Sequence, residues 1–317
     1  MIARLIAFSF AFLAIGAPAA VSAELDAKKW REIADVLEAE PSAATLSTAA
    51  LIHLATLKDA ARSLELLDRA ATYAPTDPGI AWLTLSVCTS IDTCDTGARA
   101  ARLVDLDGGN GAAHYPALRR ARQRHDAAAE DRALAAMAGA GYFDVYWSRS
   151  IVRAVDTLTE PRGRKRTPLR GIQWATNDAI GSLTIAAIPP FSAVADTCNG
   201  ERLSRPDVKG WCRSLVEVME NGDTYIAQSI GRAIGSRVFD ARDPQLARVD
   251  ERRRAQRYAS EKTAPHVEES MRTPEKANAW LDRFRVNRRE SDVYRAWLIE
   301  LGIPPDPPAD YVPKSAK

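Results

Sequence analysis

The sequence contains few of the patterns by which enzymes are usually recognised. It has no G-x-S-x-G nucleophile motif, no H-E-x-x-H zinc motif and no G-x-x-x-x-G-K-[ST] phosphate-binding loop. It has four histidines, and even the nearest two, His114 and His125, are too far apart in the sequence for a metal-binding helical spacing. The sequence therefore indicates no catalytic residue, no metal site and no cofactor. Two carboxylates that meet only in the fold would leave no such pattern.

An excess of one charge sign is also absent. The 317 residues include 43 lysines and arginines and 41 aspartates and glutamates, so the net charge is +2. A nearly neutral chain is not a general polyanion binder, and we expect no nucleic-acid partner. Runs of β-branched residues are nearly absent as well, while alanine is abundant and 46% of the residues are hydrophobic. This composition predicts an all-α protein with a substantial core.

A long apolar run occurs only at the N-terminus. Residues 1–23 contain the basic Arg4, an apolar stretch at 5–16 and the small-x-small sequence that ends at Ala23. This pattern resembles a bacterial Sec signal peptide that is cleaved after Ala23, and an uncleaved anchor is the alternative. No cysteine follows the run, which argues against a lipid anchor. We expect a periplasmic or secreted protein with no integral membrane span after cleavage.

Cysteine is scarce, and the four residues present form two separate pairs in the sequence. Outside the cytoplasm an even number of cysteines favours disulfides. The gaps of five and thirteen residues fit neither a C-x₂₋₄-C zinc site nor a C-x-x-C redox motif. Three connectivities are possible, and we predict the one that closes the shortest loops, which is Cys88–Cys94 with Cys198–Cys212.

The first third of the sequence has an internal period. Residues 67–85 align with residues 100–118 at an offset of 33, and the aligned pairs are Tyr73 with Leu106, Asp77 with Asn110, Trp82 with Tyr115 and Leu85 with Leu118. Each unit consists of a predicted helix, a turn with proline or glycine, and a second helix. A period of 33 or 34 residues is typical of a helix–turn–helix solenoid.

Residues 47–120 resemble degenerate tetratricopeptide repeats. Trp82-x₂-Leu85 and Tyr115-x₂-Leu118 resemble the start of that motif, Ala70 occupies its small position, and Pro75 occupies its closing proline. Gly108 departs from the pattern where a second closing proline is expected. The resemblance implies a right-handed superhelix whose concave face binds a peptide or protein partner. It assigns packing roles to these residues and carries over no catalytic residue.

The expected organisation is a signal peptide at 1–23, repeats at 24–158, a basic loop at 159–171, a helical C-terminal domain at 172–302 and a Pro-rich flexible tail at 303–317. The loop contains four cations that are candidates for contact with an anionic partner: Arg162, Arg164, Lys165 and Arg166. A solvated charged loop is the alternative. Later helices are predicted at 126–140, 141–155, 172–188, 206–220, 223–238, 243–262, 274–286 and 290–301.

Two local features of the later helices are also predicted. Asp144 is a candidate cap for the helix over 141–155, and Asn221-Gly222-Asp223 reads as a helix stop followed by a helix cap. Four residues at intervals of four predict a buried stripe on the helix over 223–238: Ile226, Ile230, Ile234 and Val238.

These features favour a periplasmic interaction or scaffold module that binds an as yet unidentified protein or peptide on a helical-repeat surface. One alternative is an envelope enzyme of hydrolase type whose site residues are dispersed among the helices. Another is a structural envelope protein that self-associates. A deep pocket with perturbed pKa values would favour the enzyme, whereas a groove or an exposed apolar patch would favour the binding module.

Overall fold

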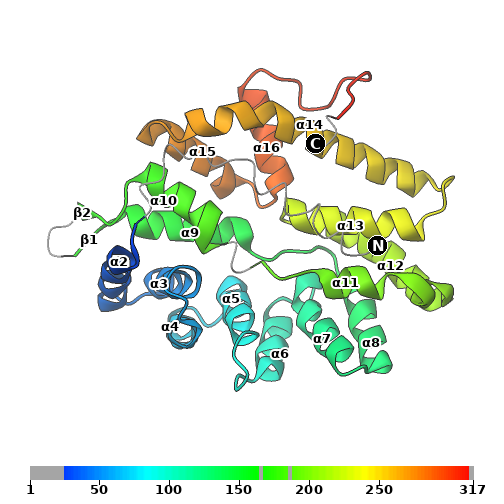
Figure 1. Cartoon of the computed structure of the whole chain (residues 1–317), viewed down its shortest axis with the longest axis horizontal. Helices are drawn as coiled ribbons and strands as arrows, with labels where there is room; N and C mark the ends of the chain where they lie inside the picture. Colours follow the sequence, from blue (N-terminus) through cyan, green and yellow to red (C-terminus); the bar gives the residue numbers. More distant parts are fainter. Residues whose placement is uncertain (1–24, 164–166, 185–187, 314–317) are drawn as a thin grey trace.

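The computed structural model describes residues 25–163, 167–184 and 188–313. These residues form α-helices joined by turns, and their strands are limited to a hairpin of β1 (Pro161–Arg162) and β2 (Thr167–Pro168). The all-α fold predicted from composition is therefore confirmed. Figure 1 shows two parts: an arc of early helices along one side, and later helices that lie across the inner side of that arc. The predicted signal peptide lies outside the described residues.

The arc consists of consecutive helices, each packed against the next in sequence. Its members are α2 (Ala27–Ala39), α3 (Ala43–Ala55), α4 (Ala60–Tyr73), α5 (Pro78–Cys88), α6 (Thr96–Asp107), α7 (Gly111–Gln123) and α8 (Ala127–Ala138). Every one of them begins after an Asp, Asn or Ser whose side chain accepts a hydrogen bond from a backbone N–H of the first turn. Such caps fix the helix starts locally.

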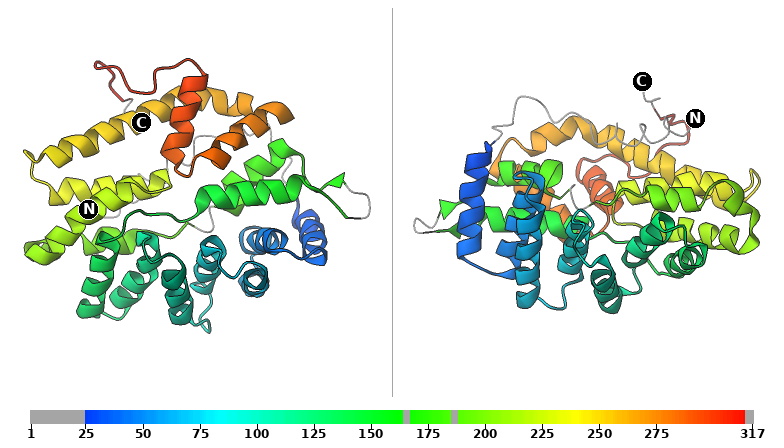
Figure 2. Two further views of the ribbon diagram at one scale, coloured as in Figure 1. Left: turned by 180° about the vertical axis from the view of Figure 1, so that it is seen from behind. Right: turned by 60° about the horizontal axis from the view of Figure 1, so that its bottom comes forward.

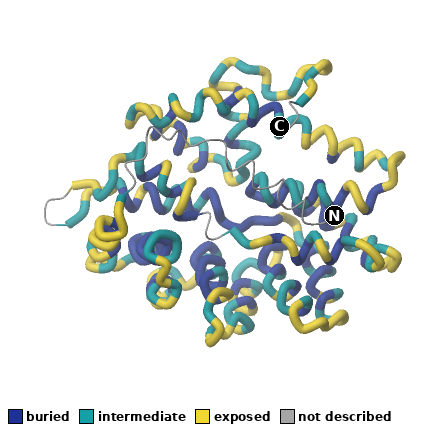
Figure 3. Tube along the Cα trace, viewed as in Figure 1, coloured by how far each residue is buried: buried dark blue, intermediate teal, exposed yellow. Residues whose placement is uncertain are grey.

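Alternate helices of the arc differ in how far they are buried. The sequences of α3 and α5 contain no Asp, Glu, Lys or Arg, and every residue from Thr45 to His53 of α3 is buried. In contrast, α4 and α6 are amphipathic and bury only a narrow stripe each. A helix that is apolar on all sides needs partners on all sides. Figure 3 shows α3 and α5 dark blue and the outward surfaces of α4 and α6 largely teal and yellow.

The partners of the inner helices come from the rest of the chain. The later elements are α9 (Trp147–Thr159), α10 (Ile172–Asp178), α11 (Ser192–Thr197), α12 (Pro206–Glu220), α13 (Tyr225–Val238), α14 (Pro244–Ser270), α15 (Pro274–Val286) and α16 (Glu290–Glu300). Helix α9 packs on α3, α11 packs on α7, and α12 packs on α8. Helices α14, α15 and α16 form a further layer, which Figure 2 shows from behind in its left panel and in a tilted view in its right panel. The inner face of the arc is therefore covered by this chain itself.

Most of the later helices lie close to their predicted ranges, with three exceptions. The helix predicted over 141–155 begins only at Trp147 and ends at Thr159, as α9. The predicted helix over 243–262 extends to Ser270 in the structure, so α14 is 27 residues long. The predicted helix over 172–188 stays α-helical only to Asp178 and continues as a π-helical turn over Ala179–Leu183. In the described part of the chain, no helix combines the length and the apolar character needed to cross a membrane.

Helices α12 and α13 approach each other closely, which changes the predicted buried stripe of α13. Ile234 and Val238 are fully buried as predicted, but Ile226 and Ile230 are only half-buried. The closest approach is at Gly231, where an added Cβ would lie 3.0 Å from the Met219 side chain and 3.2 Å from two backbone atoms of α12. The spacing of large apolar residues could not reveal a contact made by a glycine.

The structure contains both disulfides with the local pairing. Cys88 is the last residue of α5 and bonds to Cys94, just before α6 begins. Cys198 caps the C-terminus of α11 and bonds to Cys212 inside α12. The first bond therefore spans the turn between α5 and α6, and the second spans a 3-10 helix (Gly200–Ser204) and the first two turns of α12. No cysteine of the described chain is free.

The residues assigned to repeat packing lie in the arc. Ala70, Trp82, Leu85, Tyr115 and Leu118 are all buried, on α4, α5 and α7. Pro75 lies exposed in the turn between α4 and α5.

Residues 303–313, the described part of the Pro-rich tail, form no helix or strand and lie against α14. Arg254 of α14 donates hydrogen bonds to the carbonyl oxygens of Pro308, Ala309 and Tyr311, and the Tyr311 ring packs edge-on against Tyr258 at 5.1 Å between centroids.

Candidate functional site

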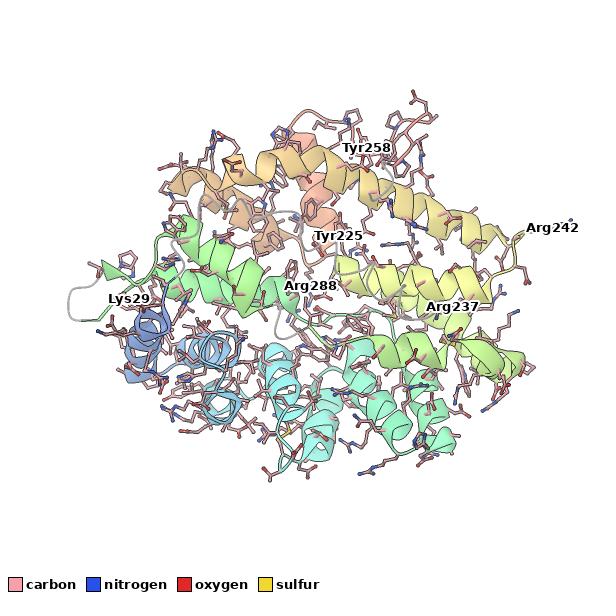
Figure 4. The ribbon with its side chains drawn as sticks, viewed as in Figure 1. Lys29, Tyr225, Arg237, Arg242, Tyr258 and Arg288 are labelled. Carbon is pink, nitrogen blue, oxygen red and sulfur yellow. A yellow bond between two sulfur atoms is a disulfide. The ribbon has the colours of Figure 1, made fainter. Side chains whose placement is uncertain are left out.

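The candidate site is a cleft of about 400 Å³ where the arc meets the later helices. Three connecting segments form its walls: the linker between α8 and α9, the turn between α12 and α13, and the turn between α15 and α16. We call it the junction cleft, and its lining residues are Gly141, Tyr142, Phe143, Asp144, Asn221, Asp223, Val286, Asn287, Arg288, Arg289 and Asp292. Figure 4 places Arg288 between α9 and α13, near the middle of the molecule.

Asn110 connects the arc to the linker. It is fully buried and precedes α7, where its Oδ1 atom accepts hydrogen bonds from the backbone N–H of Ala112 at 3.0 Å and of Asp144 at 2.9 Å. Its Nδ2 atom donates to the Asp144 carbonyl oxygen at 2.7 Å and to the Tyr146 hydroxyl at 3.0 Å. One amide thus starts α7 and fixes the linker beside it. Asp77, which aligns with Asn110 at the sequence offset of 33, likewise caps α5 and forms an ion pair with Arg153 of α9.

Tyr146 has an unusual backbone conformation that these contacts maintain. Its φ of 58° lies in the left-handed region, which side chains other than glycine seldom occupy. The residue is 1% exposed, and its hydroxyl donates to the Asp107 carboxylate. The left-handed residue turns the chain directly into α9, whose first residue is Trp147. Strain of this kind persists only where surrounding contacts determine the conformation.

Two buried carboxyl groups lie behind the wall of the cleft. Asp223, 3% exposed, accepts hydrogen bonds from the backbone N–H of Val145 at 3.0 Å and of Trp147 at 3.1 Å, one on each oxygen. Asp144, 7% exposed, accepts from the Tyr146 N–H at 2.6 Å and shares a hydrogen bond with the Asp223 carboxyl group. Asp223 therefore supplies the N-terminal cap of α9 from a different part of the chain.

Burial raises the pKa of both carboxyl groups. For Asp223, loss of hydration is the main cause and the negative charge of Asp144 adds to it, so its pKa is well above the usual range. The pKa of Asp144 is also raised by burial, although its hydrogen bonds to Asp223 and to the Tyr146 N–H oppose the shift. Burial therefore favours the protonated form of both carboxyl groups, and each group affects the titration of the other.

The third wall is linked to Asp223 through the backbone. The Glu290 N–H donates to the Asp223 carbonyl oxygen at 2.8 Å, and the Glu290 carboxylate accepts from the Tyr225 N–H at 2.6 Å. Burial raises the pKa of Glu290 to about 7. The Ser148 hydroxyl donates to the Arg288 carbonyl oxygen at 3.0 Å. All three walls are thus joined by hydrogen bonds that have Asp223 at their centre.

The rim of the cleft combines exposed apolar groups with a cation. Val286 is 81% exposed and Tyr142 is 37% exposed, which is unusual for such large hydrophobic residues. Arg289 forms an ion pair with Asp292 at 2.7 Å. The neighbouring Arg288 is exposed, and its side chain forms no ion pair with any described residue. This arrangement suits a carboxylate next to an apolar side chain on a bound segment.

The predicted cap residues have other roles. Asp144 does not start the helix predicted over 141–155, because α9 begins only at Trp147 and its cap comes from Asp223. Asp223 does not cap α13, because Thr224 does so by accepting from the Ala227 N–H. The sequence signals marked both aspartates as helix caps, but the partner of Asp223 lies more than 70 positions away and has no local signature.

A second cleft, of about 480 Å³, lies between α7, α8 and α11. Its most buried charge is Glu130, which is 6% exposed. The Glu130 carboxylate accepts hydrogen bonds from Arg122 at 2.8 Å, Thr197 at 2.7 Å and Arg202 at 3.0 Å. These bonds join α8 to the segment around Cys198, so the charge of Glu130 is used to stabilise the fold.

The cations of the basic loop are only partly described. Arg162 forms ion pairs with Glu160 and Glu40, and its side chain is 12% exposed. Its charge is thus balanced within the protein. Arg164, Lys165 and Arg166 lie outside the described residues.

Among the described residues, no group of three or more potential metal ligands is close enough to bind one ion. Comparisons with protein-family models, with curated proteins and with solved structures found no match for this chain.

Proposed function

We propose that the protein is a non-catalytic interaction module of the bacterial periplasm, and that its partner is an extended peptide segment bound at the junction cleft. The segment carries an acidic side chain next to an apolar one. The acidic group pairs with Arg288, and the apolar group packs on Val286 and Tyr142. In this proposal the helix pairs from α3 to α8 are tetratricopeptide-like, and residues 1–23 direct export and are removed.

The observation that carries the proposal is a difference in exposure between the inner face of the arc and the junction cleft. The inner face of the arc, where such repeats usually bind, is covered by α9 and α11. The junction cleft instead exposes Val286 at 81% next to a cation without a described partner. A cleft with exposed apolar and charged groups is a common peptide site.

An enzymatic role for the aspartate pair is the weaker alternative. A general acid or base must be able to contact the substrate. Both oxygens of Asp223 accept backbone N–H groups, and Asp144 uses its oxygens for the Tyr146 N–H and for Asp223. Substrate chemistry at this pair would therefore disrupt the cap of α9.

To test this, a photo-crosslinking amino acid replaces Val286, and the protein is expressed in the periplasm of the bacterium that normally produces it. The same residue at Ile299 of α16, which is 60% exposed, is the matched control. We expect one dominant protein to crosslink from position 286 and not from position 299. Arg288→Glu should abolish this product, whereas Arg242→Glu, an exposed arginine in the turn before α14, should not.

Equal labelling from both positions, or a product that survives Arg288→Glu, would reject the junction cleft as the binding site. A crosslink only to a second copy of this chain would instead support self-association, which light scattering of the purified protein would verify.

A further inference from the structure

The second cleft, between α7, α8 and α11, contains two charged groups that the fold does not engage. Its volume is about 480 Å³, which is larger than that of the junction cleft. Glu130 and Arg122 form an ion pair at 2.8 Å on one side of it and hold the surrounding elements together. Arg119 of α7 and Asp196 of α11 also line the cleft, and neither forms a hydrogen bond through its side chain with a described residue.

The position of Arg119 follows from two contacts between α7 and the segment that contains α11. The Tyr115 hydroxyl donates to the Pro190 carbonyl oxygen just before α11, and the Arg122 guanidinium donates to the Thr197 hydroxyl at 3.2 Å. Arg119 comes four residues after Tyr115 and three before Arg122, so it lies on the same face of α7, between these two contacts. Its side chain is half-buried there and forms no ion pair with any described residue.

Asp196 supplies the opposite charge in the same cleft. Its side chain is 51% exposed, and its one ionic contact among the described residues is with Arg122 at 3.8 Å, which is too long for a hydrogen bond. Arg122 donates to Glu130 at 2.8 Å instead, so its charge is already balanced. No ion pair joins Asp196 to Arg119 in the described chain. The cleft therefore presents a separated cation and anion to a ligand.

We propose that the second cleft binds a small zwitterion, either a free amino acid or a short peptide, with its carboxylate on Arg119 and its ammonium group on Asp196. A guanidinium group pairs with a carboxylate through two parallel hydrogen bonds, and a carboxylate accepts from an ammonium group. The apolar lining residues are limited to Ala127 and Ala193, so recognition depends on these charges. The two clefts share no lining residue, so the proposal is independent of the proposed function.

The test is isothermal titration calorimetry of the oxidised protein with the dipeptide L-alanyl-L-alanine. Two matched probes each lack one charge: the N-acetyl dipeptide has no ammonium group, and the dipeptide amide has no carboxylate. The dipeptide should bind saturably. Each probe should bind about tenfold more weakly or worse, because it loses one charge-assisted contact. Equal binding of the dipeptide and both probes overturns the proposal.

Two variants assign each charge of the ligand to a residue. Arg119→Gln should weaken dipeptide binding by about tenfold or more and leave binding of the amide unchanged, because the amide has no carboxylate to lose. Asp196→Asn should weaken dipeptide binding and leave binding of the N-acetyl dipeptide unchanged. Arg124→Gln, an exposed arginine at the end of α7 that does not line the cleft, is the control and should bind like the wild type. Thermal unfolding verifies that each variant is folded. Wild-type binding by Arg119→Gln overturns the proposal.

Titration with free L-alanine separates the two sources of such a zwitterion. Its two charges are closer together than those of the dipeptide, while its side chain is the same. Tighter binding of L-alanine identifies a free amino acid as the ligand, and tighter binding of the dipeptide identifies a short peptide. The absence of saturable binding by both molecules overturns the proposal.

Discussion

Replacing Asp223 by alanine should destabilise the protein far more than an average substitution. The carboxyl group of Asp223 accepts two buried backbone N–H groups, those of Val145 and Trp147. Alanine leaves both donors without an acceptor, and the 3%-exposed site admits little water. Each buried unsatisfied donor costs about 1–3 kcal/mol. We therefore expect the free energy of unfolding to fall by about 2–6 kcal/mol.

Asparagine at the same position should give an intermediate result. Its carbonyl oxygen replaces one acceptor, while its NH₂ group can donate to Asp144 but cannot accept the second N–H. One unsatisfied donor remains, so the expected loss is about 1–3 kcal/mol. Asp223→Ala should therefore be less stable than Asp223→Asn, because it leaves two backbone donors without an acceptor and Asp223→Asn leaves one.

The assay is urea unfolding followed by circular dichroism at one pH, with both disulfides intact. Asp240→Ala is the control, because Asp240 is exposed and its side chain has no described partner; it should change stability by less than about 0.5 kcal/mol. If Asp223→Ala cost no more than this control, Asp223 would not be the residue that joins α9 to α13, and the account of the junction would be wrong.

Three further predictions concern other parts of the fold. Because the pKa of Glu290 is raised to about 7, the folded state binds more protons than the unfolded state between about pH 4.5 and 7. The free energy of unfolding should therefore fall as pH rises through this range. Glu290→Gln should make this fall smaller, as measured by urea unfolding at a series of pH values. Joint replacement of Cys198 and Cys212 by serine opens a loop of sequence separation 14 and should cost about 3 kcal/mol in the same assay. Gly222→Ala places a Cβ 2.8 Å from the Met219 carbonyl oxygen and should lower the free energy of unfolding by about 1–3 kcal/mol. Gly210→Ala, within α12, is the control: its added Cβ has no neighbouring atom within 4 Å, so it should stabilise the protein by about 0.5–1 kcal/mol. Chemical denaturation of both variants distinguishes local strain at Gly222 from a general effect of replacing glycine.

The helices could be predicted from the sequence because their boundaries are set by nearby residues. The range predicted for α12 is the range observed, since Pro206 begins the helix and Asn221-Gly222 ends it. The prediction was wrong at the start of α9. Nothing near Trp147 indicates that its helix is capped by Asp223, since that hydrogen bond joins residues 76 positions apart. Local signals determine where helices form, whereas the joints between distant segments depend on the fold.

The candidate site was less predictable for the same reason. Val286, Tyr142 and Arg288 come from two segments that are far apart in the sequence, and none of them belongs to a recognisable motif. The sequence period of 33 residues aligned Asn110 with Asp77 and predicted its place before a helix, but it did not predict that the Asn110 amide would bind the α8–α9 linker. The second cleft is likewise apparent only after α11 packs against α7.

The cover over the inner face of the arc also determines the order in which this protein can fold. The chain emerges with its N-terminus first, so α3 and α5 are made long before the segments that bury them and fix α9. Hydrogen bonds that complete the junction join Val145 to Asp223 and Ser148 to Arg288, across 78 and 140 positions. Contacts of such separation form late. The nascent arc therefore exposes its most apolar helices until nearly the whole chain has been synthesised, and this interval is when the protein is most exposed to aggregation and most in need of a chaperone.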